Sequence, residues 1–120
     1  MAAADRFTIT VNGKQTHGAR PWGGVDPITV SAQIIMGLQT IVSRQTELTK
    51  EAAVISVGKF TAGVRNNIIP EKAELVGTIR TLDVEMRDII HEKIKKTATL
   101  IAESAAVSYT HLTLPTTPYV

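Results

Sequence analysis

Alternating apolar and polar residues near the start of the chain predict a strand over residues 6–12. Phe7, Ile9 and Val11 fall on one face of this segment. A period of two is typical of a strand that buries one face. The strand is expected to end where a glycine-rich stretch, residues 13–25, begins.

A helical period follows the glycine-rich stretch. Asp26 and Pro27 suit the N-cap and the first turn of a helix, because aspartate accepts backbone hydrogen bonds there and proline lacks the N–H that a first turn leaves unpaired. We expect the helix to run through about Arg44 and to have one apolar face. The residues that form this face by spacing are Ile28, Ala32, Ile35, Leu38 and Val42.

Two more strands and a second helix complete the pattern. β-branched residues predict a strand over residues 53–60, and alternation predicts another over residues 71–80. In the latter strand Arg80 falls on the polar face. Helical spacing then predicts a helix over residues 83–105. Its expected inner stripe is Met86, Ile90, Ile94, Ala98, Ile101 and Ala105.

This order of elements predicts an α+β fold. Strand, helix, strand, strand, helix is most of a ferredoxin-like split βαβ arrangement, a two-layer sandwich in which two helices cover one face of a four-stranded antiparallel sheet. A fourth strand would have to come from the C-terminal segment, where it could extend up to Leu114, before a proline.

The C-terminal segment differs in composition from the rest of the chain. It contains no Lys, Arg, Asp or Glu after Glu103 and is rich in threonine and proline. Residues 108–120 resemble the non-native ends of fragmentary gene models, and we expect them to be non-native or disordered, although they could mimic the last strand. They are left out of the functional interpretation.

Composition narrows the classes of function. A chain of 120 residues with 43% hydrophobic content fits one domain. A net charge of +2 without a basic block predicts no nucleic-acid or membrane partner. Three histidines and no cysteine are too few for a self-contained metal site. No apolar run reaches the ~18 residues of a membrane helix, so we expect a soluble, cytoplasmic protein.

Candidate chemistry centres on one histidine. His17 stands in the glycine-rich stretch, where a loop can present an imidazole to a reaction, although a solvated turn histidine that caps nearby backbone is the alternative. Trp22 could cover a substrate, but packing of the loop against the sheet is the favoured interpretation. Asp88, His91 and Glu92 lie close together on the second predicted helix, among lysines, and are expected to form an ordinary solvated face.

Three motifs carry a family resemblance. They are the stretch from His17 to Ile28, the segment Gly63-Val-Arg-Asn-Asn-Ile-Ile-Pro70, and Gly77-Thr-Ile-Arg80. In this order they resemble the dimerisation, or lid, domain of the zinc-dependent exopeptidase and N-acyl-amino-acid amidohydrolase family, in particular its hippurate hydrolase and indole-acetyl-amino-acid hydrolase branch. The resemblance covers about residues 2–106, and it implies a lid domain over residues 1–107.

The resemblance also implies roles for individual residues. His17 matches the lid histidine that enters the active site of the partner subunit and stabilises the oxyanion there. Asn67 and Arg80 match residues that hold the carboxylate or amide of the substrate, although a turn asparagine and a surface arginine are the alternatives. The two zinc ions or other divalent ions of the family belong to a catalytic domain whose ligand motifs are missing here, so we expect no metal to bind this chain.

As a fragment, the chain is therefore expected to be inactive alone. The resemblance implies a homodimer formed through the lid domains, a missing catalytic domain as partner, and an N-acyl amino acid or a peptide as substrate of the parent protein. A free-standing module of ferredoxin-like fold, which senses a small ligand or binds another protein, is the alternative. An RNA-binding sheet would need exposed aromatic residues, and the chain has only five aromatic residues.

Overall fold

The computed structural model describes residues 3–105, 109–113 and 116–118. In chain order the elements are β1 (Ala3–Asn12), β2 (Thr16–His17), the 3₁₀ helix η1 (Pro21–Gly23), α1 (Pro27–Gln45), β3 (Ala53–Ala62), β4 (Ile68–Ile69), β5 (Lys72–Thr81), α2 (Val84–Ser104), β6 (Tyr109–Thr113) and β7 (Thr116–Pro118). The three strands and two helices expected before residue 106 are confirmed, with ends that move by up to three residues.

The strands form one main sheet and one small sheet. The main sheet has the order β3-β5-β1-β6, all pairs are antiparallel, and β7 also pairs with β1. Thus two short segments, and not one closing strand, lie along β1. Pro115 stands between them in the sequence, and proline has no N–H to donate to a neighbouring strand. The expected strand end at Leu114 lies outside the described residues.

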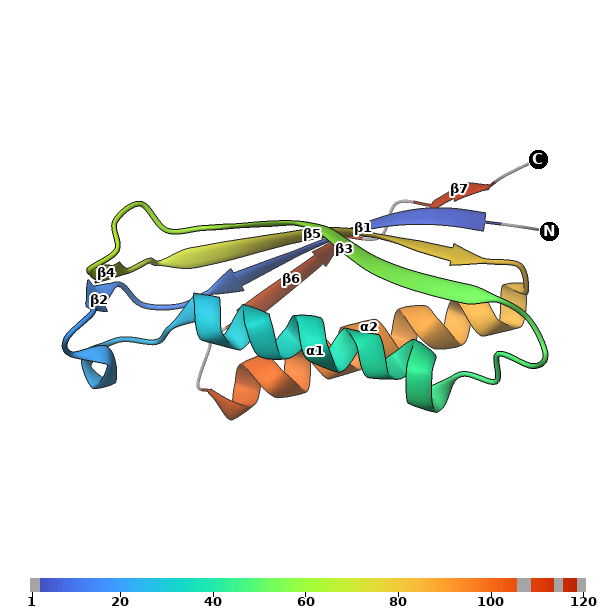
Figure 1. Cartoon of the computed structure of the whole chain (residues 1–120), viewed down its shortest axis with the longest axis horizontal. Coiled ribbons are helices and arrows are strands. Elements are labelled where there is room, and N and C mark those ends of the chain that lie inside the picture. The colour runs from blue at the N-terminus through green and yellow to red at the C-terminus, as the bar shows by residue number, and fades with distance from the viewer. Residues whose placement is uncertain (1–2, 106–108, 114–115, 119–120) are drawn as a thin grey trace.

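The small sheet was not predicted from the sequence. It consists of β2 and β4, which pair through Thr16 with Ile69 and through His17 with Ile68. Two-residue strands are too short to show any periodicity. This sheet joins two long connections at one end of the molecule, which we call the tip, residues 13–25 and 63–71 (Figure 1).

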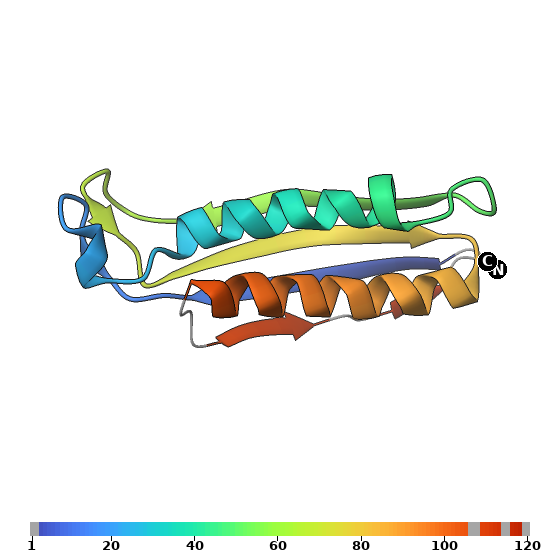
Figure 2. The same cartoon turned by 90° about the horizontal axis from the view of Figure 1, so that it is seen from below.

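The molecule has two layers. Both helices lie on the same face of the main sheet, with α1 over β3 and β5 and α2 beside it (Figures 1 and 2). No described helix covers the other face, which we call the helix-free face. The structure therefore confirms an α+β chain with two helices and antiparallel sheets.

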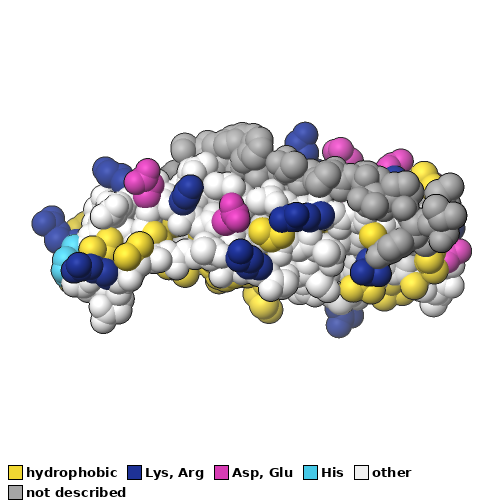
Figure 3. Space-filling model, turned by 90° about the horizontal axis from the view of Figure 1, so that it is seen from above, with side chains coloured by type: hydrophobic (Ala, Val, Ile, Leu, Met, Phe, Trp, Pro, Cys, Tyr) yellow, Lys and Arg dark blue, Asp and Glu magenta, His cyan; other side chains and the backbone are white. Residues whose placement is uncertain are grey.

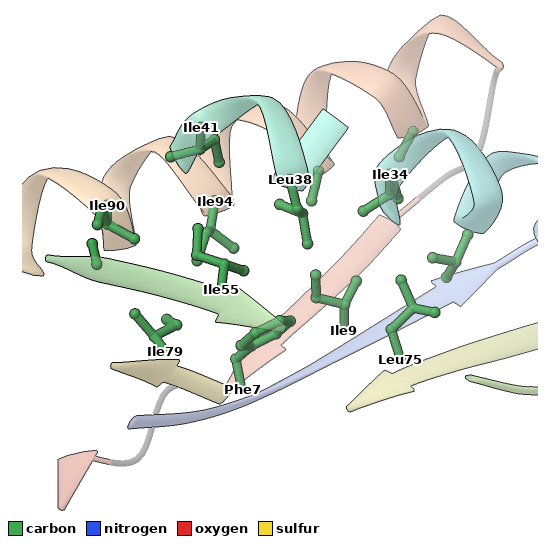
Figure 4. Close-up of a cluster of buried hydrophobic side chains, with 14 of the residues drawn as sticks. Phe7, Ile9, Ile34, Leu38, Ile41, Ile55, Leu75, Ile79, Ile90 and Ile94 are labelled. Carbon is green, nitrogen blue, oxygen red and sulfur yellow. The ribbon is translucent and has the colours of Figure 1, made fainter. Parts of the chain in front are cut away.

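The core lies between the helices and the sheet (Figure 4). Phe7, Ile9 and Val11 of β1 are completely buried, as their alternation predicts. The side chains of Leu75 and Ile79 on β5 meet them from the neighbouring strand. On α2 the expected stripe is confirmed at Met86, Ile90, Ile94 and Ala98. At its end Ile101 and Ala105 are only half-buried, and Ala102 is buried instead.

The expected inner face of α1 is wrong in part. The apolar residues that α1 buries are Pro27, Val30, Ile34, Leu38 and Ile41, so only Leu38 belongs to the expected set. Ile28 and Ala32 are exposed, whereas Ile35 and Val42 are half-buried. Because apolar residues occupy two adjacent stripes of α1, spacing alone could not decide which of them meets the sheet. One apolar stripe therefore remains accessible on the flank of the helix.

Candidate functional site

His17 stands in a tightly hydrogen-bonded turn. The His17 carbonyl accepts a hydrogen bond from the Arg20 backbone N–H at 2.9 Å, and the carbonyl of Arg20 accepts one from the Thr16 hydroxyl at 3.2 Å. Through β2 the same residues are paired with β4. The turn is thus held from within and by a neighbouring segment, although His17 itself is exposed.

The ring of His17 is oriented by its own turn. The Ala19 backbone N–H donates to Nδ1 at 3.1 Å. An imidazole nitrogen that accepts a hydrogen bond carries no proton, so the neutral ring must carry its proton on Nε2. Nε2–H is therefore a donor on an exposed side chain whose tautomer is set by the backbone.

Asn67 lies directly beside the His17 turn. The backbone carbonyl of Asn67 accepts a hydrogen bond from the Gly18 N–H at 2.8 Å. A Cβ atom at Gly18 would stand 3.2 Å from that carbonyl oxygen, which is closer than an ordinary contact. Gly63 begins this connection with a φ of +84°, a conformation that glycine adopts without strain. The structure therefore brings His17 and Asn67 together at the tip.

Arg80 lies at the other end of the sheet. It is exposed near the end of β5, where it is opposite Ala4 of β1 and Val54 of β3. From Lys72, at the tip end of β5, to Arg80 the strand rises by about 26 Å, at ~3.3 Å per residue. Within one chain Arg80 therefore cannot contact a small molecule that is bound between His17 and Asn67.

The helix-free face of the sheet carries several basic side chains (Figure 3). Strand alternation places Arg6, Lys72 and Arg80 on this face, together with the acidic Glu74. The register shift between Val57 and Lys59 places Lys59 opposite Val76, on the same face. An open groove of about 710 Å³ lies at the tip end of this face, and Arg65, Ile68 and Glu74 are among the residues that line it. The groove adjoins the Asn67 connection and does not include His17.

The expectation that Trp22 packs the loop against the sheet is wrong. Trp22, in η1, is 76% exposed, and Val64, in the connection between β3 and β4, is 98% exposed. The Pro21–Gly23 segment is held by its own backbone bonds, from Gly23 N–H to the Arg20 carbonyl and from Gly24 N–H to the Pro21 carbonyl. The tip therefore presents two large apolar side chains to its surroundings.

Sequence reasoning missed a buried polar cluster between β1 and α2. The Asp5 side chain is fully buried and accepts hydrogen bonds from Arg87 Nε at 2.9 Å, from an Arg87 terminal nitrogen at 3.2 Å, and from His91 Nε2 at 2.8 Å. His91 thus belongs to an internal network and not to the solvated face that was expected for it. The only signal in the sequence was a charged residue at an inward-facing strand position, Asp5, two residues before Phe7.

The hydrogen bonds and charges within this cluster shift the pKa values of Asp5 and Arg87. Burial raises the pKa of Asp5, but hydrogen bonds from Arg87 and His91 and the positive charge beside the carboxylate outweigh burial, so the pKa lies below its ordinary value of 3.8. The hydrogen bond to Asp5 raises the pKa of Arg87. The cluster is therefore an ion pair with a histidine that donates to the same carboxylate.

The described residues do not form a metal site. Within residues 3–105 no group of three or more His, Asp or Glu side chains stands close enough together to hold a metal ion. Asp5 and His91 share a hydrogen bond, but Arg87 occupies the same carboxylate, and a cation there would be repelled. The arrangement at the tip is that of an exposed histidine whose Nδ1 accepts a hydrogen bond from its own turn. None of the described helices is long and apolar enough to cross a membrane.

Comparison with known proteins identifies the family. Residues 3–106 match the family model described as the peptidase dimerisation domain. The chain is 39% identical over 109 residues to N-acetylcysteine deacetylase of Bacillus subtilis, and 40% identical over 104 residues to hippurate hydrolase of Campylobacter jejuni. These matches cover 91% and 87% of this chain but 27% of each relative.

A solved structure agrees with this match. The chain is 32% identical, with a TM-score of 0.68, to a Bacillus subtilis protein described as a dinuclear metal-binding peptidase of the M20 family, and the alignment covers all of this chain and 27% of that one. The chain thus spans about 27% of the length of these three hydrolases. It belongs to the peptidase dimerisation domain family, as its three motifs predict.

Proposed function

We propose that this chain is the lid domain of a metal-dependent amidohydrolase that cleaves N-acyl amino acids or peptides, and that it contributes His17 to the active site of a partner subunit. The observation that carries the proposal is the His17 turn, in which backbone hydrogen bonds fix both the position of the ring and the proton on Nε2. The names of its hydrolase relatives support the reaction class.

His17 would stabilise the oxyanion that forms when water attacks the scissile amide. A neutral Nε2–H donor can bind a developing negative charge without being consumed as an acid, and a rigid donor needs little reorganisation as the charge appears. The attacking water would be activated by divalent ions, two zinc ions in our proposal, in a catalytic part of the parent that lies outside this chain.

The geometry favours action on a partner subunit. Ala3 is opposite Thr81, so residues that precede Ala3 in a longer protein would join the domain at the Arg80 end. His17 lies at the opposite end of the sheet (Figure 1). A lid that is attached to its catalytic part at the Arg80 end holds its tip far from that part. At the tip, exposed Trp22 and Val64 provide an apolar surface for docking.

Asn67 and Arg80 would then bind the substrate from different subunits. Asn67 accompanies His17 into the partner site, where its amide would bind the amide or carboxylate of the substrate. Arg80, which is about 26 Å away along the strand, would hold the substrate carboxylate in the site of its own subunit, where its planar guanidinium can form two parallel bonds.

The homodimer would form along β3 and α1. β3 is the end strand of the described main sheet on the side of α1. The Gln39 side chain of α1 donates to the Ile55 carbonyl of β3 at 3.3 Å, which places this flank of α1 beside the strand. Exposed Ile28 and Ala32 lie on the same flank. An accessible apolar stripe next to an open strand edge suits pairing with a second copy.

We further propose a ferredoxin-like split βαβ architecture for this domain over residues 1–107. The strand order β3-β5-β1-β6 and two helices on one face support it. Residues 108–120 are proposed to be a non-native extension whose β6 and β7 mimic the closing strand. The parent is proposed to be cytoplasmic, with no nucleic-acid or membrane partner.

The proposal is tested in a chimera in which residues 3–106 replace the lid of the Campylobacter hippurate hydrolase. We expect hydrolysis of hippurate by the chimera, and a kcat about 10²- to 10³-fold lower in the variant His17→Ala. Lys14→Ala, in the same loop, is the control and should leave kcat unchanged. An active chimera with an unchanged kcat for His17→Ala would refute the role of His17. The isolated chain should hydrolyse nothing and bind no stoichiometric zinc.

A further inference from the structure

The side chain of Thr16 closes the turn that carries His17. Its hydroxyl donates to the Arg20 carbonyl at 3.2 Å, and the Arg20 N–H donates to the His17 carbonyl at 2.9 Å. The Arg20 carbonyl also accepts from the Gly23 N–H at 3.0 Å, so both of its lone pairs are engaged. Thr16 therefore links the His17 turn to the 3₁₀ helix η1 through a single carbonyl group.

Two consecutive glycines make room for the Thr16 side chain. A Cβ atom at Gly24 would stand 2.7 Å from Cγ2 of Thr16, and a Cβ atom at Gly23 would stand 3.3 Å from its Oγ1. A larger residue at Gly24 would therefore displace Thr16. Thr16 is half-buried, whereas residues 17–23 are all exposed. Both branches of the threonine side chain thus lie against the backbone of the loop.

We propose that Thr16 is a positioning residue for His17. The Ala19 N–H, which donates to Nδ1 of His17 at 3.1 Å, belongs to the turn that the Thr16 hydroxyl closes. Without this hydroxyl the turn would open, Ala19 would release Nδ1, and the neutral ring would be free to carry its proton on either nitrogen. This inference rests on the role of His17 in the proposed function and adds the residue that holds its tautomer.

Threonine suits this position because its Cβ atom carries two groups. A β-branched side chain has few allowed χ1 rotamers, and packing of Cγ2 against Gly24 selects the one that directs Oγ1 to the Arg20 carbonyl. Valine keeps this shape but has no donor, whereas serine keeps the donor and has no methyl group. The variants Thr16→Val and Thr16→Ser therefore separate the hydrogen bond from the packing.

The first test measures the tautomer of His17 by NMR of the ring nitrogens in the full chain, at about pH 9, where imidazoles are neutral. We expect the Nε2–H form to exceed the Nδ1–H form by about tenfold in the wild-type chain. In Thr16→Val the ratio should fall to that of a histidine in an unfolded peptide. In Thr16→Ser it should stay close to the wild-type ratio.

The second test measures kinetics in the chimera with the hippurate hydrolase. Thr16→Val should lower kcat about tenfold and change KM less than about twofold, because a misplaced donor is missed mainly in the transition state. Thr16→Ser should keep kcat within about twofold. Thr40→Val is the matched control, since the Thr40 hydroxyl also donates to a backbone carbonyl, that of Gly37 at 2.7 Å on α1. It should change neither kcat nor the tautomer ratio.

The outcomes separate this inference from the proposed function. A wild-type tautomer ratio in Thr16→Val would overturn the inference, even with a lower kcat, because the residue would then act on the structure without setting the ring. Equal losses in Thr16→Val and Thr16→Ser would overturn it too, since serine keeps the hydroxyl. If His17→Ala leaves kcat unchanged, the proposed function fails, and the tautomer ratio in the free chain still decides whether Thr16 positions the ring.

Discussion

Asp5 and Arg87, which are 82 positions apart in the sequence, form a buried two-point ion pair between the first strand and the second helix. Both oxygens of the carboxylate are engaged, and His91, one helical turn beyond Arg87, donates to one of them. This contact joins β1 to α2 at the end of the domain that carries Arg80. It fixes the helix against the sheet by a directional interaction in addition to apolar packing.

Loss of the Asp5 carboxylate should lower the free energy of unfolding. Asp5→Asn leaves Arg87, only 20% exposed at its side chain, without its charge partner, and we expect a decrease of about 2–3 kcal/mol in the free energy of unfolding. Urea denaturation followed by circular dichroism measures it. The control is Glu85→Gln, which removes a solvent-exposed pair with Lys50 at 4.0 Å and should cost less than about 0.5 kcal/mol. Equal losses of unfolding free energy in the two variants would show that the buried pair stabilises the fold no more than the exposed pair does.

The same carboxylate should make stability depend on pH. Because the pKa of Asp5 is lowered in the folded state, the unfolded chain takes up the proton more readily. The stabilisation is therefore fully present above the unfolded pKa, near 3.8, and is lost as pH falls through the lower folded pKa. Urea midpoints at pH 7, 5, 4 and 3 should show the difference between the wild-type chain and Asp5→Asn shrinking in acid. A difference that stays constant down to pH 3 would contradict this assignment.

The tip should depend on the close approach of Gly18 to Asn67. Gly18→Ala would place a methyl group 3.2 Å from the Asn67 carbonyl oxygen, so the β2–β4 pairing must open by a few tenths of an ångström. We expect faster hydrogen exchange of the backbone amides of residues 16–18 and 68–69, with a loss of global stability of about 1 kcal/mol or less. Gly58→Ala is the matched control, since nothing stands within 4 Å of a Cβ there. Unchanged exchange at the tip in Gly18→Ala would argue against the rigid turn.

Dimer formation should depend on the flank of α1. Ala32→Glu introduces a charge on the exposed apolar stripe beside β3. It should raise the dissociation constant of the dimer tenfold or more, which corresponds to a loss of about 1.4 kcal/mol or more in the free energy of dimer formation. Light scattering across a concentration series measures it. Thr99→Glu, at an exposed position of α2, is the control and should leave the oligomeric state unchanged. A wild-type chain that remains monomeric at every concentration would remove the basis for this interface.

Much of the fold could be predicted because its signals are local. Alternation in β1 and β5 and the Asp26-Pro27 start of α1 depend on residues that are neighbours in sequence, and the Asp26 side chain indeed accepts from the backbone of Ile28 and Thr29. The buried stripe of α1 was misjudged because two apolar stripes compete on that helix. Only the sheet beneath the helix selects between them, and its position is a tertiary property.

The candidate site was predictable in its members but not in its geometry. His17, Asn67 and Arg80 follow from the three motifs, yet no spacing indicates that the first two share the tip while Arg80 lies at the far end of β5. The register of the strands determines these positions. The Asp5 cluster escaped prediction for the same reason, because its partners are more than 80 positions away in the sequence. Trp22 was assigned to packing from residue type alone, and the structure exposes it.

The most direct test of the central claim is subunit complementation between two inactive chimeras. One carries His17→Ala in the lid, and the other carries an intact lid with a substituted metal ligand in its catalytic half. If His17 acts on the partner subunit, mixed dimers have one complete site in each pair, and an equal mixture should recover about a quarter of the activity of the unmodified chimera. A mixture that stays as inactive as its two components, although mixed dimers form, would contradict the account.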